Sequence, residues 1–166
     1  LVHGMGHVGK QVALLAKWIG LEVFLIDDRK ELLDDPDLER IPDRFLTIQE
    51  FMQAYPKHDF NNTFIVLTTR SNEIDIRDLP GLLEKKPKYI GVIGSKRRWL
   101  TTCDALIEKG VSEEVLNNIY SPIGLELKSE TPEEIAISIL AEILAVKNNS
   151  SGENMRNFRR KIKNVG

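Results

Sequence analysis

The sequence holds a single cysteine, Cys103, among its 166 residues. One thiol cannot form an internal disulfide or a cysteine-based zinc site, so a reducing compartment is favoured and we expect a cytoplasmic protein. No run approaches the roughly 18 consecutive apolar residues that a membrane span needs, and we expect no membrane association. With 11 glycines and 7 prolines, the chain is also unlike collagen-like and low-complexity proteins.

The chain has no surplus of either charge. Its 23 Lys and Arg against 25 Asp and Glu give a net charge of −2. A dedicated nucleic-acid-binding protein needs a basic surplus to displace counterions, so we expect no nucleic acid partner. We expect no metal either, because His3 and His7 lie across a glycine turn and His58 is far along the chain. A hydrophobic content of 42% is sufficient for the core of a soluble globular domain.

The beginning of the chain has the pattern of a βαβ unit. Residues 1–3 run into Gly4-Met5-Gly6-His7-Val8-Gly9, and apolar residues then recur at helical spacing as far as Ile19. A short apolar run over residues 22–26 follows and ends at Asp27-Asp28-Arg29. The order of strand, glycine turn, helix and strand is that of a βαβ unit.

Further alternation of strands and helices predicts the fold class. The near-continuous apolar runs over residues 63–69 and 88–94 are typical of strands covered on both faces of a parallel sheet. We therefore predict an α/β fold, a three-layer doubly wound and mostly parallel sheet of Rossmann-like type. Helices are predicted over residues 75–86 and 95–109, an exposed acidic loop in residues 27–50, and a third short strand within residues 44–48.

The last predicted helix runs from Thr131 to about Lys147. Thr131 is a typical N-cap, followed by proline at the first helical position and Glu134 at the capping-box position. The helix is apolar on most sides, so it packs either inside the domain or at a subunit interface, as in a homodimer. We assign residues 1–147 to a Rossmann-like domain and residues 148–166 to a linker and basic tail. The tail carries Arg156, Arg159, Arg160, Lys161 and Lys163, which either contact a phosphate-bearing partner or form a solvated end.

The pattern Gly4-x-Gly6-x-x-Gly9 indicates a nucleotide-binding turn. Its glycines permit a tight turn, the approach of a pyrophosphate and close packing of helix on strand. Asp27, at the end of the next strand, can accept hydrogen bonds from a ribose diol. Arg29 beside it can pair with a 2′-phosphate that Asp27 would repel, so NAD and NADP both remain open. The alternative is a structural turn that binds nothing.

Residues 94–98, Gly-Ser-Lys-Arg-Arg, indicate a second anion-binding feature. Ser95 is a natural N-cap, and three cations then oppose the positive end of the helix dipole. Either a bound phosphate or the acidic side chains of residues 27–43 must offset them.

The turns that follow parallel strands share one sheet edge, so residues 4–9, 68–75, 94–98 and 121–124 should face a common crevice. Asp75 is either part of that crevice or a helix N-cap. The predicted cofactor-binding residues are Gly4, Gly6, His7, Val8, Gly9, Asp27, Asp28, Arg29, Thr69, Arg70, Gly94, Ser95, Lys96 and Arg97.

Several segments over residues 1–147 resemble the Rossmann domain of the xanthine dehydrogenase accessory factor family, XdhC/CoxI. They are the glycine turn, residues 25–29, residues 89–98, the S-P-I-G-L segment at 121–125 and the T-P-E-E-I-A-x-S-I-L-A-E segment from Thr131. The resemblance implies a factor that binds molybdenum cofactor, supports its sulfuration and hands it to a molybdenum hydroxylase apoenzyme. Family members usually carry a further N-terminal domain. Because the chain begins with Leu1 rather than Met, we expect a fragment or a cut domain.

Three functional interpretations follow. The leading one is an accessory protein that binds NAD, NADP or, by resemblance, molybdenum cofactor, and acts through contacts with a hydroxylase apoenzyme and as a homodimer. The second is an NAD(P)-dependent oxidoreductase, which would need a substrate domain for which little chain remains. The third is a nucleotide-sensing regulatory module. No catalytic residue is assigned, and a binding protein is favoured over an enzyme.

Overall fold

The computed structural model describes residues 1–157. They contain one five-stranded sheet in the order β3-β2-β1-β4-β5. Every neighbouring pair of strands is parallel. This is the Rossmann strand order, so the predicted doubly wound fold is confirmed, including the short third strand. The strands are β1 (Val2–His3), β2 (Leu25–Ile26), β3 (Arg44–Phe45), β4 (Phe64–Leu67) and β5 (Tyr89–Val92).

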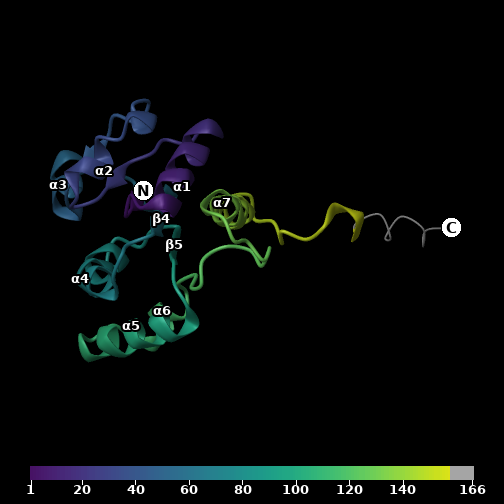
Figure 1. Ribbon diagram of the computed structural model, residues 1–166. Coiled ribbons are helices and arrows are strands. Elements are labelled where there is room, and N and C mark those ends of the chain that lie inside the picture. Colours follow the sequence, from purple (N-terminus) through teal and green to yellow (C-terminus); the bar gives the residue numbers. More distant parts are fainter. Residues whose placement is uncertain (158–166) are drawn as a thin grey trace.

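Helices cover both faces of the sheet (Figure 1). Successive strand residues alternate between the two faces: Leu25 packs with α1 and α7, whereas Ile26 packs with α3, α4 and α5. Both cores need apolar residues, which explains why the strands appear as continuous apolar runs. The helices are α1 (His7–Trp18), α2 (Lys30–Leu33), α3 (Ile48–Ala54), α4 (Asn72–Leu83), α5 (Lys96–Glu108), α6 (Glu113–Leu116) and α7 (Pro132–Lys147).

The start of α4 differs from the prediction. The helix begins at Asn72 rather than at residue 75, and Ser71 is its N-cap. Asp75 is therefore not an N-cap; it lies in the first turn and is fully buried. Its neighbours in sequence gave no sign of burial, because the group that balances its charge comes from α5.

The acidic segment after β2 is more ordered than an exposed loop. It contains α2 and a short 3-10 helix, Pro36–Leu38, and it buries Leu33, Leu38 and Ile41. The Arg44 guanidinium donates hydrogen bonds to the carbonyl oxygens of these same three residues. One side chain from β3 thus holds the segment against the sheet, a long-range role that local composition does not reveal.

The predicted start of α7 is confirmed, because Thr131 and Glu134 form a complete capping box. None of the helices in the described part of the chain is both long and apolar enough to cross a membrane. The predicted linker and tail helix are only partly covered by the structure. Among the tail cations Arg156 is described, whereas Arg159, Arg160, Lys161 and Lys163 lie outside the described residues.

The S-P-I-G-L segment at residues 121–125 and the segment that begins at Thr131 contact each other. Ser138 Oγ donates a 2.6 Å hydrogen bond to the carbonyl oxygen of Leu125. The Glu142 carboxylate accepts from the Gly124 N–H at 3.1 Å and from the Tyr89 hydroxyl at 2.5 Å. A Cβ on Gly124 would lie only 2.5 Å from Ser138 Oγ, so the close approach of the two segments requires glycine at this position. The S-P-I-G-L segment and α7 therefore form a structural clasp beside β5.

We expect Ser138→Ala to lower the free energy of unfolding by about 1 kcal/mol, because the Leu125 carbonyl loses its donor within the clasp. For a chain of this size the melting temperature should fall by roughly 2–4 °C. Thermal unfolding followed by circular dichroism measures the change. Ser151→Ala, at an exposed position after α7, is the matched control and should melt with the parent chain. Equal melting temperatures for both variants would argue against the clasp.

Candidate functional site

The glycine turn lies at the switch point of the sheet, where β1 and β4 are neighbours and their helices leave to opposite faces. Gly4 follows β1 with φ +104°, a left-handed conformation suited to glycine. A Cβ on Gly9 would lie 1.8 Å from the Gly4 carbonyl oxygen, whereas one on Gly6 would meet nothing within 4 Å. Gly9 thus permits close packing inside the turn, and Gly6 keeps the space in front of it open.

The start of α1 presents unpaired amides toward this open space. Its N-cap is Gly6, which has no side chain to accept from the first-turn N–H groups, and the first turn contains no acidic residue. These N–H groups have no acceptor within a helix and carry the positive end of the dipole. His7 is exposed and Val8 half-buried in the same turn. The geometry fits an anion such as a phosphate.

Asp27 is buried and already fully hydrogen-bonded. Its carboxylate accepts from the Met5 N–H at 2.6 Å and from three nitrogens of Arg29, the backbone N–H at 2.9 Å, Nε at 2.9 Å and Nη2 at 2.8 Å. Burial alone would raise the pKa of Asp27, but the hydrogen bonds from Arg29 and Met5 outweigh it and hold the pKa below its ordinary value. Four donors fill the four lone-pair positions of a carboxylate. A ribose could bind Asp27 only after Arg29 moves.

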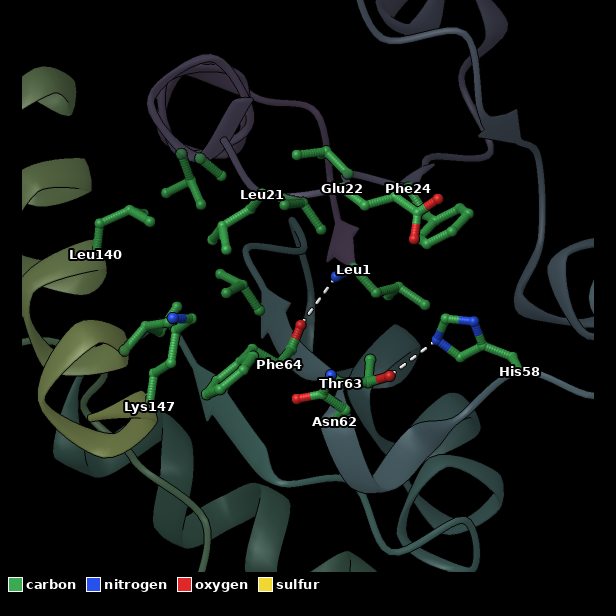
Figure 2. Close-up of a pocket in the computed structure, with 16 residues that line it drawn as sticks. Leu1, Leu21, Glu22, Phe24, His58, Asn62, Thr63, Phe64, Leu140 and Lys147 are labelled. Carbon is green, nitrogen blue, oxygen red and sulfur yellow. Dashed lines mark hydrogen bonds between the residues drawn. The ribbon is translucent and has the colours of Figure 1, made fainter. Parts of the chain in front are cut away.

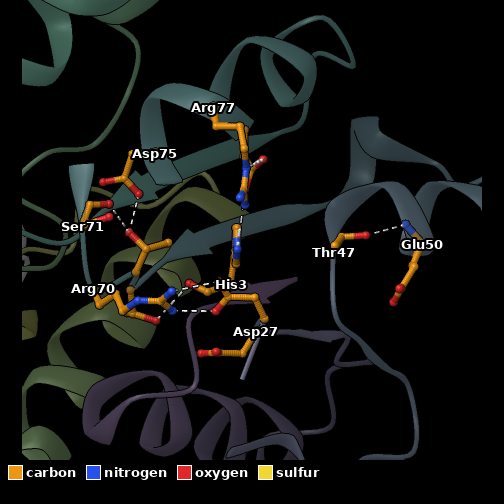
Figure 3. Close-up of polar contacts among 12 residues, drawn as sticks. His3, Asp27, Thr47, Glu50, Arg70, Ser71, Asp75 and Arg77 are labelled. Atoms are coloured by element: carbon orange, nitrogen blue, oxygen red, sulfur yellow. Dashed lines mark hydrogen bonds and ion pairs between the residues drawn. The ribbon is translucent and has the colours of Figure 1, made fainter. Parts of the chain in front are cut away.

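A second ion pair, between Arg70 and Asp28, spans the crevice. Arg70, after β4, makes two hydrogen bonds to Asp28, after β2, at 2.5 and 2.9 Å (Figure 3). The hydrogen bonds from Arg70 lower the pKa of Asp28 to about 2. Behind the pair is a hollow of about 10 Å³, room for roughly one water or hydroxyl group. Its walls are His3, Gly4, Asp27, Asp28, Arg29, Thr69, Arg70 and Ile74.

The start of α5 forms the other side of the site. Ser95 caps the helix, as predicted, by accepting from the Arg98 N–H. Arg98 Nη2 lies 2.7 Å from Asp75, which also accepts from Thr69 Oγ1 at 2.5 Å. The buried acid Asp75, not an acid of residues 27–43, therefore balances this cation. Lys96 and Arg97 are exposed and make no ion pair within residues 1–157.

The structure brings some predicted residues together and leaves others apart. Arg70 is shared by the small hollow at the switch point and by an open hollow of about 420 Å³ that Ser95 and Arg97 also line. The segment 121–124, expected in the same crevice, instead bonds to Val92 and α7 and lines neither hollow. The predicted residues that line neither hollow are Gly6, His7, Val8, Gly9, Gly94 and Lys96.

Sequence reasoning missed a buried histidine at this site. His3, which we considered only as a metal ligand, is 4% exposed at the end of β1. Its Nε2 atom lies 3.7 Å from Asp78 Oδ2, and Arg77 pairs with the same carboxylate (Figure 3). Among residues 1–157 no group of three or more His, Cys, Asp and Glu side chains is placed to hold a metal ion. The only sequence signal for His3 was its place directly before the glycine turn.

A separate cavity lies at the opposite edge of the sheet, between the starts of β1 and β4 and the helices α1 and α7 (Figure 2). Its volume is about 220 Å³, and most of its lining is apolar, as at Leu21, Phe24 and Leu140. The polar groups nearby are used internally, since His58 hydrogen-bonds to Thr63 at 2.8 Å. Ligands of open parallel sheets bind at the carboxyl ends of the strands, so the crevice by the glycine turn is the candidate site.

Comparison with known proteins shows the family of the chain. A family model described as the XdhC Rossmann domain matches residues 1–143. The chain belongs to this XdhC family. It is 36% identical over 149 residues to the uncharacterised protein YqeB of Escherichia coli K12, covering 90% of this chain and 27% of that protein. It is 29% identical over 154 residues to a probable xanthine dehydrogenase subunit of Bacillus subtilis 168, covering 89% and 42%.

A third relative is the molybdenum cofactor insertion chaperone PaoD of Escherichia coli K12, 30% identical over 86 residues, which are 52% of this chain and 27% of that protein. The chain thus spans between about a quarter and two fifths of these relatives. A crystal structure described as a xanthine dehydrogenase from Bacillus halodurans superposes with a TM-score of 0.72 at 24% identity, over 94% of this chain and 44% of that one. At this identity the superposition shows the fold alone.

Proposed function

We propose that residues 1–147 are the cofactor-binding domain of a maturation factor for a molybdenum hydroxylase. The domain would bind a phosphate-bearing cofactor at the switch point, either molybdenum cofactor or NAD(P), and present it to the apoenzyme. The observation that carries the proposal is the start of α1, where Gly6 leaves both the space and the first-turn amides open to an anion. Membership of the XdhC family and the name of the relative PaoD support the choice of cofactor.

The cations around the crevice add to this support. Arg97 and Lys96 are exposed at the start of α5, and Arg70 lines both the hollow beside this helix and the small hollow beside Gly4. Phosphate groups are favoured at such helix starts because the amides and the side chains act together. The residues present therefore fit a phosphate-bearing cofactor, whose molybdenum ion or nicotinamide would supply the redox chemistry.

A binding role suits the buried acids better than a catalytic one. Asp27, Asp75 and Asp78 are each paired with an arginine, respectively Arg29, Arg98 and Arg77. A general base must have a lone pair directed at its substrate. The three aspartates are instead used in ion pairs that fix the side chains lining the crevice. We assign the transfer of the cofactor to contacts with the apoenzyme.

We also propose that the factor acts in the cytoplasm as a homodimer. Trp18 is 81% exposed and lies with Ile137, 53% exposed, in a shallow groove between α1 and α7. Exposed apolar groups gathered in one patch are typical of protein interfaces. Analytical ultracentrifugation distinguishes a dimer from a monomer directly.

Arg97→Glu should weaken the binding of ADP and of molybdenum cofactor by about tenfold at low salt, since it reverses a charge at the start of α5, on the other side of the crevice. The difference should shrink at high salt because ions screen the attraction in the parent chain. Isothermal titration calorimetry at two salt concentrations measures both effects. Lys85→Glu makes the same charge change at an exposed position beyond the far end of α4 and should leave both affinities unchanged. A parent chain that binds neither compound would refute the proposed function.

A further inference from the structure

Two buried side-chain atoms within residues 1–157 have no hydrogen-bond partner, Arg98 Nε and His3 Nδ1. Arg98 already pairs with Asp75 through another nitrogen. His3 is different, because its side chain is 5% exposed and the residue lines the hollow at the switch point. Buried polar atoms in folded proteins are nearly always hydrogen-bonded, and leaving one unpaired is unfavourable. An unpaired atom at the wall of a candidate site points to a partner that enters from outside.

The surroundings of the ring determine which kind of partner fits. Nε2 lies 3.7 Å from Asp78 Oδ2, and Arg77 holds this carboxylate with hydrogen bonds of 2.8 and 2.7 Å. A carboxylate on that side favours the proton on Nε2. Burial lowers the pKa of His3, although Asp78 opposes the shift. A neutral ring protonated at Nε2 offers a lone pair at Nδ1, so the missing partner is a hydrogen-bond donor.

Other acceptors at the hollow already have at least one donor. Asp27 accepts four hydrogen bonds, both oxygens of Asp28 accept from Arg70, and the Gly4 carbonyl accepts from Thr68 Oγ1 at 2.7 Å. Within residues 1–157, His3 Nδ1 is the buried side-chain acceptor on a residue lining this hollow that has no donor at all. The volume of about 10 Å³ matches one hydroxyl group rather than a whole ligand.

We propose that His3 Nδ1 accepts a hydrogen bond from a ribose hydroxyl of a nucleotide bound at the switch point. This assignment rests on the proposed function and makes it more specific, because it names the sugar of a nucleotide as the group recognised. It also gives His3 the role that the sequence pattern assigns to Asp27. The side chain of Arg70, which closes the hollow together with Asp28, moves aside when the ribose enters.

The test compares ADP with 2′-deoxy-ADP and 3′-deoxy-ADP by isothermal titration calorimetry. The parent chain should bind ADP about tenfold more tightly than one of the two deoxy compounds, as expected for one neutral hydrogen bond. His3→Leu should lose this preference. His3→Asn should keep much of it, because its amide oxygen occupies the place of Nδ1, whereas His3→Gln places its amide near Nε2 and should not. Circular dichroism melts confirm that each variant folds.

The outcomes separate the two proposals. If the parent binds all three nucleotides equally, or if a folded His3→Leu keeps the preference, His3 does not recognise the ribose and the proposed function stands. If the parent binds molybdenum cofactor but no ADP, the ribose assignment fails while the maturation role is supported. If it binds neither, both proposals fail. Should His3→Leu not fold, the contrast between His3→Asn and His3→Gln decides, and equal preferences in these two variants overturn the assignment.

Discussion

Gly9→Ala is expected to lower the free energy of unfolding by about 3 kcal/mol or more, among the larger effects of a single added methyl group. The new Cβ would lie 1.8 Å from the Gly4 carbonyl oxygen and 2.6 Å from Thr68 Oγ1. These two atoms hydrogen-bond to each other at 2.7 Å and join the glycine turn to the end of β4. The Gly4 carbonyl oxygen belongs to the backbone and cannot move aside as the end of a flexible side chain can. The added methyl group therefore forces α1 away from the sheet. The melting temperature should fall by roughly 6–12 °C.

Gly6 provides the matched control for this prediction. Gly6→Ala should melt close to the parent chain, because nothing lies within 4 Å of the added Cβ and the φ of −67° suits any residue. Gly6→Val should also fold, yet it fills the space in front of the α1 amides and should abolish ADP binding. Thermal unfolding and calorimetry together separate packing from binding. A Gly9→Ala variant that melts with the parent would contradict the packing argument, and unchanged ADP affinity in Gly6→Val would contradict the site.

Asp75→Ala is expected to destabilise the fold by about 3 kcal/mol, because it leaves the half-buried Arg98 guanidinium without its counter-charge. Asp75 is fully buried and accepts from both Arg98 and Thr69. The loss should appear as an earlier midpoint in urea with an unchanged slope. This pair joins the first turns of α4 and α5, so ADP binding should weaken as well.

The double variant Asp75→Leu with Arg98→Met tests the cause of that loss. Replacing both charges by apolar groups of similar size is often neutral, since no buried charge is left unpaired. We therefore expect the double variant to unfold later in urea than Asp75→Ala. If the two variants unfold at the same midpoint, the loss comes from packing at residue 75 rather than from the stranded charge on Arg98.

Local patterns in the sequence predicted those features that depend on near neighbours. The caps at Ser95 and Thr131 were placed correctly, because a cap is decided by residues within one helical turn. The strands were found because both faces of the sheet are covered, which demands unbroken apolar runs. Their boundaries were too wide, since β2 is reduced to Leu25–Ile26.

Features that depend on distant partners were not predictable in this way. Asp75 resembled a helix cap because its counter-charge, Arg98, is 23 residues away on another helix. Asp27 was placed correctly at the end of β2, but the pattern could not show that Arg29 already occupies its carboxylate. His3 was not among the predicted site residues for the same reason, since its burial and its unpaired Nδ1 depend on residues of α4 such as Asp78. Recognising the site needed the topology that brings these side chains to one edge.

The pairing of Asp28 with Arg70 has a consequence for measured affinities. A nucleotide that must part this exposed pair binds only the fraction of molecules in which it is open, so the observed affinity understates the intrinsic one. Added salt weakens such a pair and enlarges the fraction of molecules in which it is open, which favours binding. Salt also screens the attraction between the cationic side chains and the phosphate groups, which weakens binding. The two influences oppose each other. Ionic strength should therefore alter nucleotide binding less in the parent chain than in Asp28→Asn, where the crevice is open from the start.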